Sequence, residues 1–454
     1  LLTARGIAKG ESVAILHPNG QAAIEAIYGT LYGGFRATMI NLVAGTEAIG
    51  YALDHSGARV ALVHPTQESV FQSVNPGGRI AMLNMAESAP ETVLHPVTPD
   101  DHALLMYTSG TTGRPKGVVH TQASLLAGGW TTTIAHDLTP EDTGLCVLPV
   151  YHINGLCVSV MGSLVSGGQL AMCARFSASR FWQQAAETRA TWFSVVPTIV
   201  SHLLHGETGP DPETRRRLRF GRSASSPLPV EVHTAFEARF DLPIVETMGL
   251  TETAAQILSN PLPPGTRKIG SPGIAYGNLA EVAGPDMRPL PPGQEGEIIV
   301  KGPNVMLEYL RNPEATRDSF TPDGWLRTGD LGRKDAEGYF FVTGRLKELI
   351  IKGGENIAPR EIDEVLYAHP DVVEAAAFSC PCPRYGERVE AAVALRPGST
   401  LTPETLLTLC KDRLGAFKSP DHIHFLDELP KGPSGKIQRV RLKSLLAGDL
   451  ERNS

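Results

Sequence analysis

The sequence lacks any uninterrupted apolar stretch that approaches the length of a membrane span. Its beginning, LLTARGIAKGES, also lacks the charged-then-apolar layout of a secretory signal peptide. No long basic run is present, and 41 Lys and Arg against 48 Asp and Glu give a net charge of −7. We therefore expect a protein that neither crosses a membrane nor binds nucleic acid, so that any anion site must be local.

Cysteine is scarce and scattered. The six cysteines lack metal-finger spacing, and only Cys380 and Cys382 come close to it. We expect packing thiols in a reduced, cytoplasmic protein. The chain begins without Met, in what resembles the tail of a helix, so we expect the natural N-terminus to be absent. The final Glu-Arg-Asn-Ser matches no peroxisomal or retention signal.

A chain of 454 residues is too long for one ordinary core and predicts at least two domains. Up to about residue 265, short apolar runs alternate with helix-compatible segments, which is typical of wound α/β layers. From about 265 to 345, Pro/Gly-rich turns separate short strands and predict a β-rich subdomain. We predict an N-terminal domain over 1–346 and a small α/β C-terminal domain over 347–454, with helices at Pro359–Ala368 and Pro403–Leu414.

The segment Thr108–Gly117 reads TSGTTGRPKG and combines glycines, hydroxyl side chains and a lysine. An apolar run precedes it and a helix-like pattern follows, which predicts a strand, a glycine-rich turn and a helix around phosphate. The phosphate loop of kinases and GTPases needs a glycine directly before its lysine, but Pro115 stands there and Gly117 follows. An ordinary kinase or GTPase is therefore disfavoured, and a flexible surface loop remains the alternative.

Five further segments accompany this one in order: YHINGL at Tyr151–Leu156, MGLTET at Met248–Thr253, WLRTGD at Trp325–Asp330, GRLKELIIKGGENIAP at Gly344–Pro359 and KGPSGKIQR at Lys431–Arg439. Together the six motifs resemble the adenylate-forming superfamily of acyl-CoA synthetases, luciferases and adenylation domains. The resemblance implies attack of a carboxylate on the α-phosphorus of ATP, giving an acyl-adenylate and pyrophosphate, after which a thiol displaces AMP. It also implies Mg²⁺ and coenzyme A, and a C-terminal domain that moves between the two steps.

The resemblance assigns the nucleotide site residue by residue. Glu252 would hold Mg²⁺, Thr251 would contact the α-phosphate, and Asp330 would accept hydrogen bonds from the ribose, with Arg345 nearby. Met248 replaces the aromatic residue that commonly stacks on adenine in this family. Taken alone, Glu252 could be a solvated loop carboxylate and Asp330 a turn residue. The remaining expected contacts to ATP come from Thr108, Ser109, Gly110, Thr111, Thr112, Gly113 and Lys116 at the phosphates and from Ser225, Ser226 and Thr247 at the purine.

Lys436 corresponds to the family's catalytic lysine, which bridges the attacking carboxylate and the α-phosphate. Outside this motif it would be a lysine in an exposed turn. Lys347 matches the hinge about which the C-terminal domain rotates. That rotation would bring Gly353, Gly354 and Asn356 to the thiol tunnel, where glycines let pantetheine pass close to the backbone.

The expected acid pocket is rich in polar groups, which points away from long acyl chains. We predict a small acid with a distal carboxylate or sulfonate, and Arg222 as its cation, although Arg222 could equally be structural. His152 could gate the pocket or be a hydrogen-bonded core histidine. The local sequence is similar to the oxalyl-CoA synthetase branch and less closely to malonyl-CoA synthetases, but a histidine expected after the TE motif is missing near Ala255-Gln256. The substrate residues that we predict are His152, Asn154, Ser194, Arg222 and Gln256.

The leading interpretation is thus an acid–CoA ligase, monomeric or homodimeric, that acts on a dicarboxylate such as oxalate or malonate or on a sulfo-acid such as sulfoacetate. An adenylation enzyme that loads a carrier protein would share every ATP motif. A non-catalytic nucleotide-binding regulator is the alternative of another class, disfavoured because Lys116, Glu252, Asp330 and Lys436 are all intact.

Overall fold

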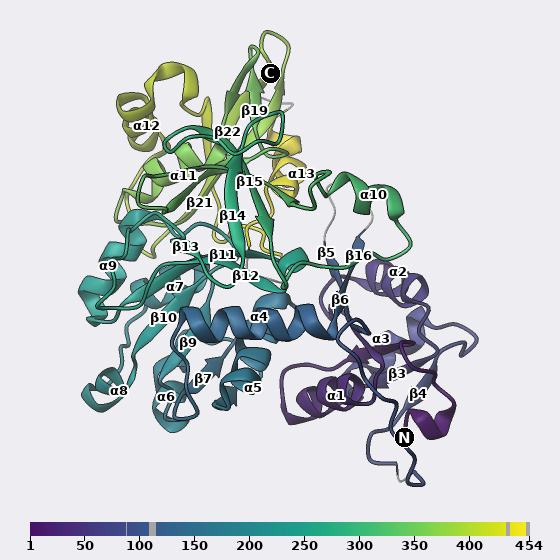
Figure 1. The fold of residues 1–454 in the computed structure, drawn as a ribbon. Coiled ribbons are helices and arrows are strands. Elements are labelled where there is room, and N and C mark those ends of the chain that lie inside the picture. Colours follow the sequence, from purple (N-terminus) through teal and green to yellow (C-terminus); the bar gives the residue numbers. More distant parts are fainter. Residues whose placement is uncertain (88, 109–114, 433–435, 451–454) are drawn as a thin grey trace.

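The computed structural model describes residues 1–87, 89–108, 115–432 and 436–450, with side chains described up to residue 446. Two seven-stranded sheets, a four-stranded sheet and a five-stranded sheet form the molecule. Figure 1 shows the chain start and the first sheet at one corner and the C-terminal sheet with α11 and α12 at the opposite end. The fold is α/β, with a large N-terminal part and a smaller C-terminal part, as the sequence predicted.

The first sheet has the strand order β16-β6-β5-β2-β1-β3-β4, and its strands from β5 to β4 are parallel. Its central strands read as continuous apolar runs because both faces are covered. Its helices are α1 (Gln21–Tyr32), α2 (Thr46–Ser56) and α3 (Glu68–Val74). The strands are β1 (Ser12–Leu16), β2 (Arg36–Met39), β3 (Val60–Val63), β4 (Ala81–Leu83), β5 (His102–Thr108), β6 (Lys116–Thr121) and β16 (Glu308–Tyr309).

The expectation of a helix directly after the glycine-rich loop is wrong. The chain first forms β6, which pairs antiparallel with β5 in a register that places Thr108 opposite Lys116. Val118 and Val119 are fully buried, and β-branched side chains favour a strand over a helix. The helix α4 (Gln122–Ala135) begins only after Thr121, whose side chain caps it. β5 and β6 therefore form an antiparallel pair, and the helix comes one strand later.

The second sheet has the order β13-β12-β11-β10-β9-β7-β8, parallel from β11 to β8. Helix α4 contacts β5 and β6 of the first sheet and β12 of the second, so it bridges the two (Figure 1). The helices here are the π-helical η3 (Asn154–Met161), α5 (Gly162–Ser166), α6 (Phe181–Glu187), α7 (Pro197–His205), α8 (Pro212–Arg217) and α9 (Val230–Phe240). The strands are β7 (Thr143–Cys146), β8 (Gln169–Met172), β9 (Trp192–Val195), β10 (Phe220–Ser223), β11 (Ile244–Leu250), β12 (Ala255–Ser259) and β13 (Ile274–Ala275).

The third sheet is antiparallel and consists of β14 (Leu279–Ala283), β15 (Glu295–Lys301), β17 (Leu326–Lys334) and β18 (Phe340–Arg345). The short helix α10 (Pro313–Asp318) precedes β17. Strands and turns dominate this part of the chain, in agreement with the β-rich composition predicted for residues 265–345.

The fourth sheet and three helices make up the C-terminal part. Both helices predicted there are confirmed as α11 (Pro359–Tyr367) and α12 (Pro403–Lys418), each with a proline in its first turn. The last helix is α13 (Arg439–Leu450). None of the described helices is long and apolar enough to cross a bilayer. The strands are β19 (Ile350–Lys352), β20 (Glu355–Ile357), β21 (Val372–Cys382), β22 (Gly386–Leu395) and β23 (His422–Phe425).

Candidate active site

A cavity gathers the residues that the sequence singled out for the purine and ribose of ATP, together with Lys436. Its wall comes from the loop after β10, from β11, from β17 and β18, and from the segment before α13. Ser225 holds a left-handed backbone angle, φ 77°, which is uncommon for a residue other than glycine and marks local strain. The predicted residues that line the cavity are Ser225, Ser226, Thr247, Met248, Asp330, Arg345 and Lys436.

The end of β11 carries Thr251 and Glu252 in a single 3-10 turn, η4 (Thr251–Thr253). His120 Nε2 donates to the carbonyl oxygen of Thr251 at 2.7 Å, and the backbone N–H of Met306 donates to that of Glu252 at 2.7 Å. Burial lowers the pKa of His120 to about 4, so its imidazole is neutral near pH 7. Backbone carbonyls held in this way fix the turn that carries Glu252.

Tyr309 connects two predicted phosphate-site residues, and sequence reasoning missed it. Its hydroxyl donates to Glu252 Oε1 at 2.7 Å, and Lys116 Nζ lies 4.5 Å from the centre of its ring. Burial and the Glu252 carboxylate both raise the pKa of Tyr309, which keeps the hydroxyl protonated and donating. No spacing rule marks a tyrosine 57 positions after Glu252; only the pairing of β16 with β6 brings it there.

Asp330 and Arg345 face one another on neighbouring strands. They are paired in the register of β17 and β18, and Arg345 Nε lies 3.0 Å from Asp330 Oδ1. Burial raises the pKa of Asp330, and the guanidinium of Arg345 opposes that rise. The pair presents a carboxylate acceptor at the edge of the cavity.

Lys436 reaches the same cavity from the C-terminal part of the chain. Its Nζ lies 3.7 Å from Glu348 Oε1, and Arg439 Nε lies 3.4 Å from the other oxygen of that carboxylate. Burial lowers the pKa of Lys436, while Glu348 and Asp330 favour its charged form. The lysine is thus a cation poised beside the Asp330–Arg345 pair. Glu348, like Tyr309, was not predicted.

Arg222 lies at the centre of a buried polar network. The guanidinium Nη1 donates to Asn154 Oδ1 at 2.9 Å and to Ser194 Oγ at 3.1 Å. Asn154 opens the π-helical segment η3, and its Nδ2 donates to Ser225 Oγ at 3.3 Å on the cavity wall. The network therefore joins three predicted substrate residues to the nucleotide cavity.

The positive charge of Arg222 is neutralised by no carboxylate of the described residues. Its side chain is 1% exposed, and among the described residues none of the Asp or Glu side chains forms an ion pair with it. Burial lowers the pKa of Arg222 to about 9. Some buried polar atoms in this region find no hydrogen-bond partner within the described protein: Arg222 Nε, His152 Nε2, Ser223 Oγ and Gln256 Oε1. Such groups are expected where a polar ligand supplies the partners.

Several predicted residues either do not line this cavity or lie outside the described residues. Ser109, Gly110, Thr111, Thr112 and Gly113 fall outside the described residues. Of the expected thiol-tunnel residues, Gly353 and Gly354 occupy the turn between β19 and β20, and Asn356 lies on β20. None of the three lines the cavity.

Other predicted residues have definite places. Gln256 lies on β12, and its Nε2 donates to the Thr131 carbonyl in α4 at 3.1 Å. Lys347 lies between β18 and β19. Glu246 lines the cavity, and one of its carboxylate oxygens has no hydrogen-bond partner among the described residues. Burial raises its pKa, and no sequence motif marked this residue.

Metal ligands are few in this site. No group of three or more His, Cys, Asp or Glu side chains suited to a metal occurs within the described parts of the chain. A single carboxylate such as Glu252 suits Mg²⁺ that keeps most of its coordination from water and phosphate oxygens.

Comparison with known proteins gives consistent matches. The sequence model for the AMP-binding enzyme matches residues 1–310, and that for the AMP-binding enzyme C-terminal domain matches residues 361–436. The chain is 47% identical to the sulfoacetate–CoA ligase of Cupriavidus necator, over 97% of this chain and 88% of the relative. It is 37% identical to the oxalate–CoA ligase of Arabidopsis thaliana, over 97% and 89%. The crystal structure of ATP-bound MatB from Rhodopseudomonas palustris superposes with a TM-score of 0.90 at 31% identity, covering 98% of this chain and 90% of that one.

Proposed function

The chain belongs to the AMP-binding enzyme family and is an AMP-forming acid–CoA ligase that works through an acyl-adenylate, and we propose that its acid is small and carries a second anionic group. The reaction uses ATP, Mg²⁺ and coenzyme A. Among such acids we propose sulfoacetate first, with oxalate and malonate as the neighbouring candidates.

The observation that carries this proposal is the buried, uncompensated charge of Arg222. A cation taken out of water without a partner is costly, and a negatively charged group of the substrate would offset that cost. A carboxylate has two coplanar oxygens and a sulfonate has three in a tripod, and either group can accept two hydrogen bonds from a guanidinium. An apolar acyl chain would leave Arg222 and its unpaired neighbours unsatisfied, so the pocket selects against fatty acids.

The relatives favour a sulfonate within this class. The chain shares more identity with the Cupriavidus ligase, named for sulfoacetate, than with the Arabidopsis ligase, named for oxalate. In oxalate the second carboxylate is bonded directly to the reacting carboxyl carbon, whereas in sulfoacetate a methylene group separates the sulfonate from the reacting carboxyl group. We assign Asn154, Ser194 and Arg222 to this distal group, and His152 and Gln256 to the remainder of the acid.

At the phosphates, Lys116 and the glycine-rich segment would hold the β- and γ-groups, and Glu252 would hold Mg²⁺. Bound there, Mg²⁺ supplies positive charge that neutralises the phosphates. We propose that Tyr309 fixes the Glu252 carboxylate through its 2.7 Å hydrogen bond and sets its distance from Lys116. Thr251 would contact the α-phosphate.

On the nucleoside side, Asp330 would accept hydrogen bonds from the ribose hydroxyls, because a carboxylate accepts and a diol donates. Arg345 holds Asp330 in place from the neighbouring strand. Met248 would pack its thioether on the purine face, beside Ser225, Ser226 and Thr247.

Lys436 would bring the two anions of the first step together. The acid carboxylate and the α-phosphate repel one another, and a cation between them stabilises the charge that concentrates as the new P–O bond forms and pyrophosphate leaves. Glu348 and Arg439 hold the lysine at the cavity. In the second step, the lysine would withdraw by rotation about Lys347, and Gly353, Gly354 and Asn356 would receive the pantetheine thiol.

A panel of acids tests this function. Pyrophosphate release is measured with ATP, Mg²⁺ and either sulfoacetate, oxalate, malonate, acetate or octanoate, each with and without CoA. We expect acid-dependent release that is fastest with a second-anion acid, and a thioester only when CoA is present. Release without any acid, or no thioester from any acid, would overturn the ligase assignment. Fastest turnover of octanoate would overturn the acid class alone.

A further inference from the structure

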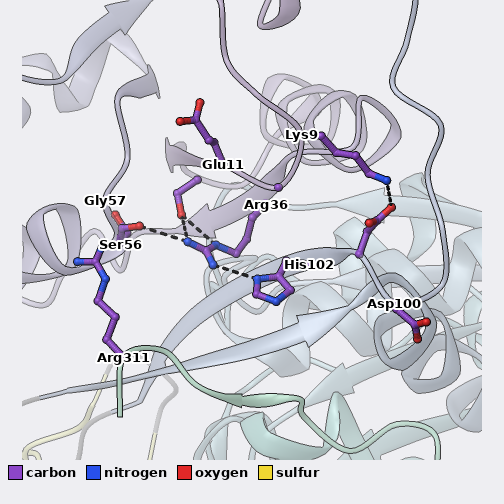
Figure 2. A pocket seen from close by; sticks show the side chains of 11 residues that line it. Lys9, Glu11, Arg36, Ser56, Gly57, Asp100, His102 and Arg311 are labelled. Atoms are coloured by element: carbon purple, nitrogen blue, oxygen red, sulfur yellow. Dashed lines mark hydrogen bonds and ion pairs between the residues drawn. The ribbon is translucent and has the colours of Figure 1, made fainter. Parts of the chain in front are cut away.

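A second cavity, of about 520 Å³, opens at the edge of the first sheet where β1, β2 and β5 begin. Figure 2 shows its lining residues, which come from the strand starts, from the end of α2 and from the loop that follows β16. The glycine-rich segment lies after the opposite end of β5. None of the residues assigned to acid, ATP or CoA lines this second cavity, so the reaction leaves it without a role.

Arg36 forms the floor of the cavity. Its side chain is only 9% exposed, and it donates to Ser12 Oγ from Nε at 3.0 Å and from Nη2 at 2.8 Å. Nη2 also donates to the Ser56 carbonyl at 3.3 Å, and Nη1 lies 3.2 Å from His102 Nδ1 (Figure 2). One N–H of Nη1 is left without an acceptor among the described residues. Arg36 is therefore held rigidly with one donor to spare.

Arg311 is a second guanidinium at the same cavity, and it has no hydrogen bond or ion pair within the described chain. Its backbone holds φ 53°, a left-handed angle that a residue other than glycine adopts only at a cost. A Cβ at Gly57 would lie 2.9 Å from Arg311 Nη2, so the absent side chain makes room for the guanidinium. Gly57 also ends α2 in the left-handed region, φ 69°, so the helix end itself calls for glycine there. The Arg311 guanidinium is thus a cation without a partner among the described residues, on the same cavity as Arg36.

Two of the three acids that line the cavity are already engaged. Asp101 pairs with Lys9 at 2.7 Å and accepts from the Thr98 backbone N–H, and Glu11 accepts from the Ala8 backbone N–H. Glu308 favours the charged form of Arg36 but forms no ion pair with it among the described residues. The positive charge of Arg311 disfavours the charged form of Arg36, because the two guanidiniums are close enough to repel one another. Asp100 also lines the cavity and forms no ion pair among the described residues, so the charges left unpaired there are two guanidiniums, Arg36 and Arg311, against one carboxylate.

We propose that this cavity binds a small phosphate dianion, held between Arg36 and Arg311, as an effector site separate from the reaction. Two converging guanidiniums match the oxygens of a phosphate, and a neutral His102 adds a ring nitrogen beside them. The ligand is either free phosphate or the phosphate group of a small metabolite. Because His102 begins β5 and Thr108 ends it, occupancy would stabilise the strand that leads to the glycine-rich segment.

Calorimetric titration of the full chain tests this site, with inorganic phosphate in one arm and glycerol 3-phosphate in the other. The background is Lys116→Ala, which weakens phosphate binding at the glycine-rich segment. In that background we compare Arg311→Gln with Arg317→Gln, an exposed arginine on α10 that contacts only Asp318, at 3.7 Å. We expect one site that Arg311→Gln weakens at least about tenfold and that Arg317→Gln leaves unchanged.

Tighter binding of inorganic phosphate would identify the free ion as the ligand, and tighter binding of glycerol 3-phosphate would identify a phosphate ester. Loss of all binding in the Lys116→Ala background, or equal affinity with and without Arg311, would overturn the proposal. Arg311→Glu provides a second variant at this exposed position and should abolish binding while the thermal midpoint in chloride stays within a few degrees. Neither result depends on which acid the ligase activates.

Discussion

Replacing Arg222 with Met separates the proposed part of this arginine in substrate binding from any part in folding. Met keeps much of the length of the side chain but removes the charge. In the native protein the guanidinium donates to Asn154 and Ser194, and Ser194 Oγ donates independently to Asn154 Oδ1 at 3.0 Å. Those two partners therefore remain bonded to one another in the variant.

The expected stability change is small or favourable. Replacing a complete buried ion pair by apolar side chains of similar size is often neutral or stabilising, by about 1–4 kcal/mol, and Arg222→Met likewise leaves no opposite charge behind. The expected activity change is large, because losing one partner of a buried charge pair costs about 2–5 kcal/mol. At about 1.4 kcal/mol per factor of ten, kcat/KM for sulfoacetate should fall roughly 30- to 5,000-fold.

Steady-state kinetics with sulfoacetate and with acetate measure this effect, and thermal unfolding without substrate measures stability. We expect kcat/KM for acetate to change less than about threefold, because acetate has no second anionic group for Arg222 to bind. Arg216→Met, at an exposed arginine, is the matched control. It should change neither kcat/KM for sulfoacetate, nor kcat/KM for acetate, nor the thermal midpoint. An Arg222→Met enzyme that keeps its full kcat/KM on every second-anion acid would refute the assignment. A collapse of the thermal midpoint would show that Arg222 is structural.

Three further predictions concern the ATP side and the core. Lys436→Ala should suppress adenylation far more than thioester formation from supplied acyl-adenylate, and equal losses in both half-reactions would contradict its role. Tyr309→Phe removes a hydrogen bond to the Glu252 carboxylate that is worth about 1.5–3 kcal/mol, so the Mg²⁺ concentration for half-maximal rate should rise roughly 10- to 100-fold. An unchanged Mg²⁺ dependence would contradict the proposed role of Tyr309. Burial lowers the pKa of His120 and His152 to about 4, so the unfolded chain takes up protons near pH 6.5 that the folded chain accepts only near pH 4. The free energy of unfolding should therefore fall as pH drops from 6.5 to 4, by up to about 1.4 kcal/mol per pH unit for each imidazole. His120→Gln should reduce this slope. An unchanged slope in His120→Gln would contradict the claim that His120 is buried in its neutral form.

Ordered motifs predicted much of the candidate site, because three of them stand on or beside β11, β17 and β18, whose residues line one cavity. Asp330 and Arg345, for example, are adjacent only through the register of β17 and β18, yet both stand in recognisable segments. The purine neighbours and Lys436 reach the same cavity from distant parts of the chain. The roles of all these residues remain proposals.

Sequence patterns failed where contacts depend on pairing between remote strands. Tyr309 reaches Glu252 because β16 adds to the edge of β6, and nothing near Tyr309 in the sequence indicates that pairing. The expected helix after the glycine-rich segment was wrong because Val118 and Val119 favour a strand that the neighbouring β5 can pair with. Arg311 is likewise invisible in the sequence, because its significance comes from a backbone angle and from the space above Gly57.

A competition among acids tests the central claim most directly. The enzyme is given ATP, Mg²⁺, CoA and equal concentrations of sulfoacetate, oxalate, malonate, acetate and octanoate, and mass spectrometry follows the CoA thioesters as they form. We predict that a second-anion thioester, with sulfoacetyl-CoA foremost, accumulates first, and that AMP appears in equal amount. Accumulation of acetyl-CoA or octanoyl-CoA ahead of every second-anion product would contradict the claim that Arg222 selects the acid.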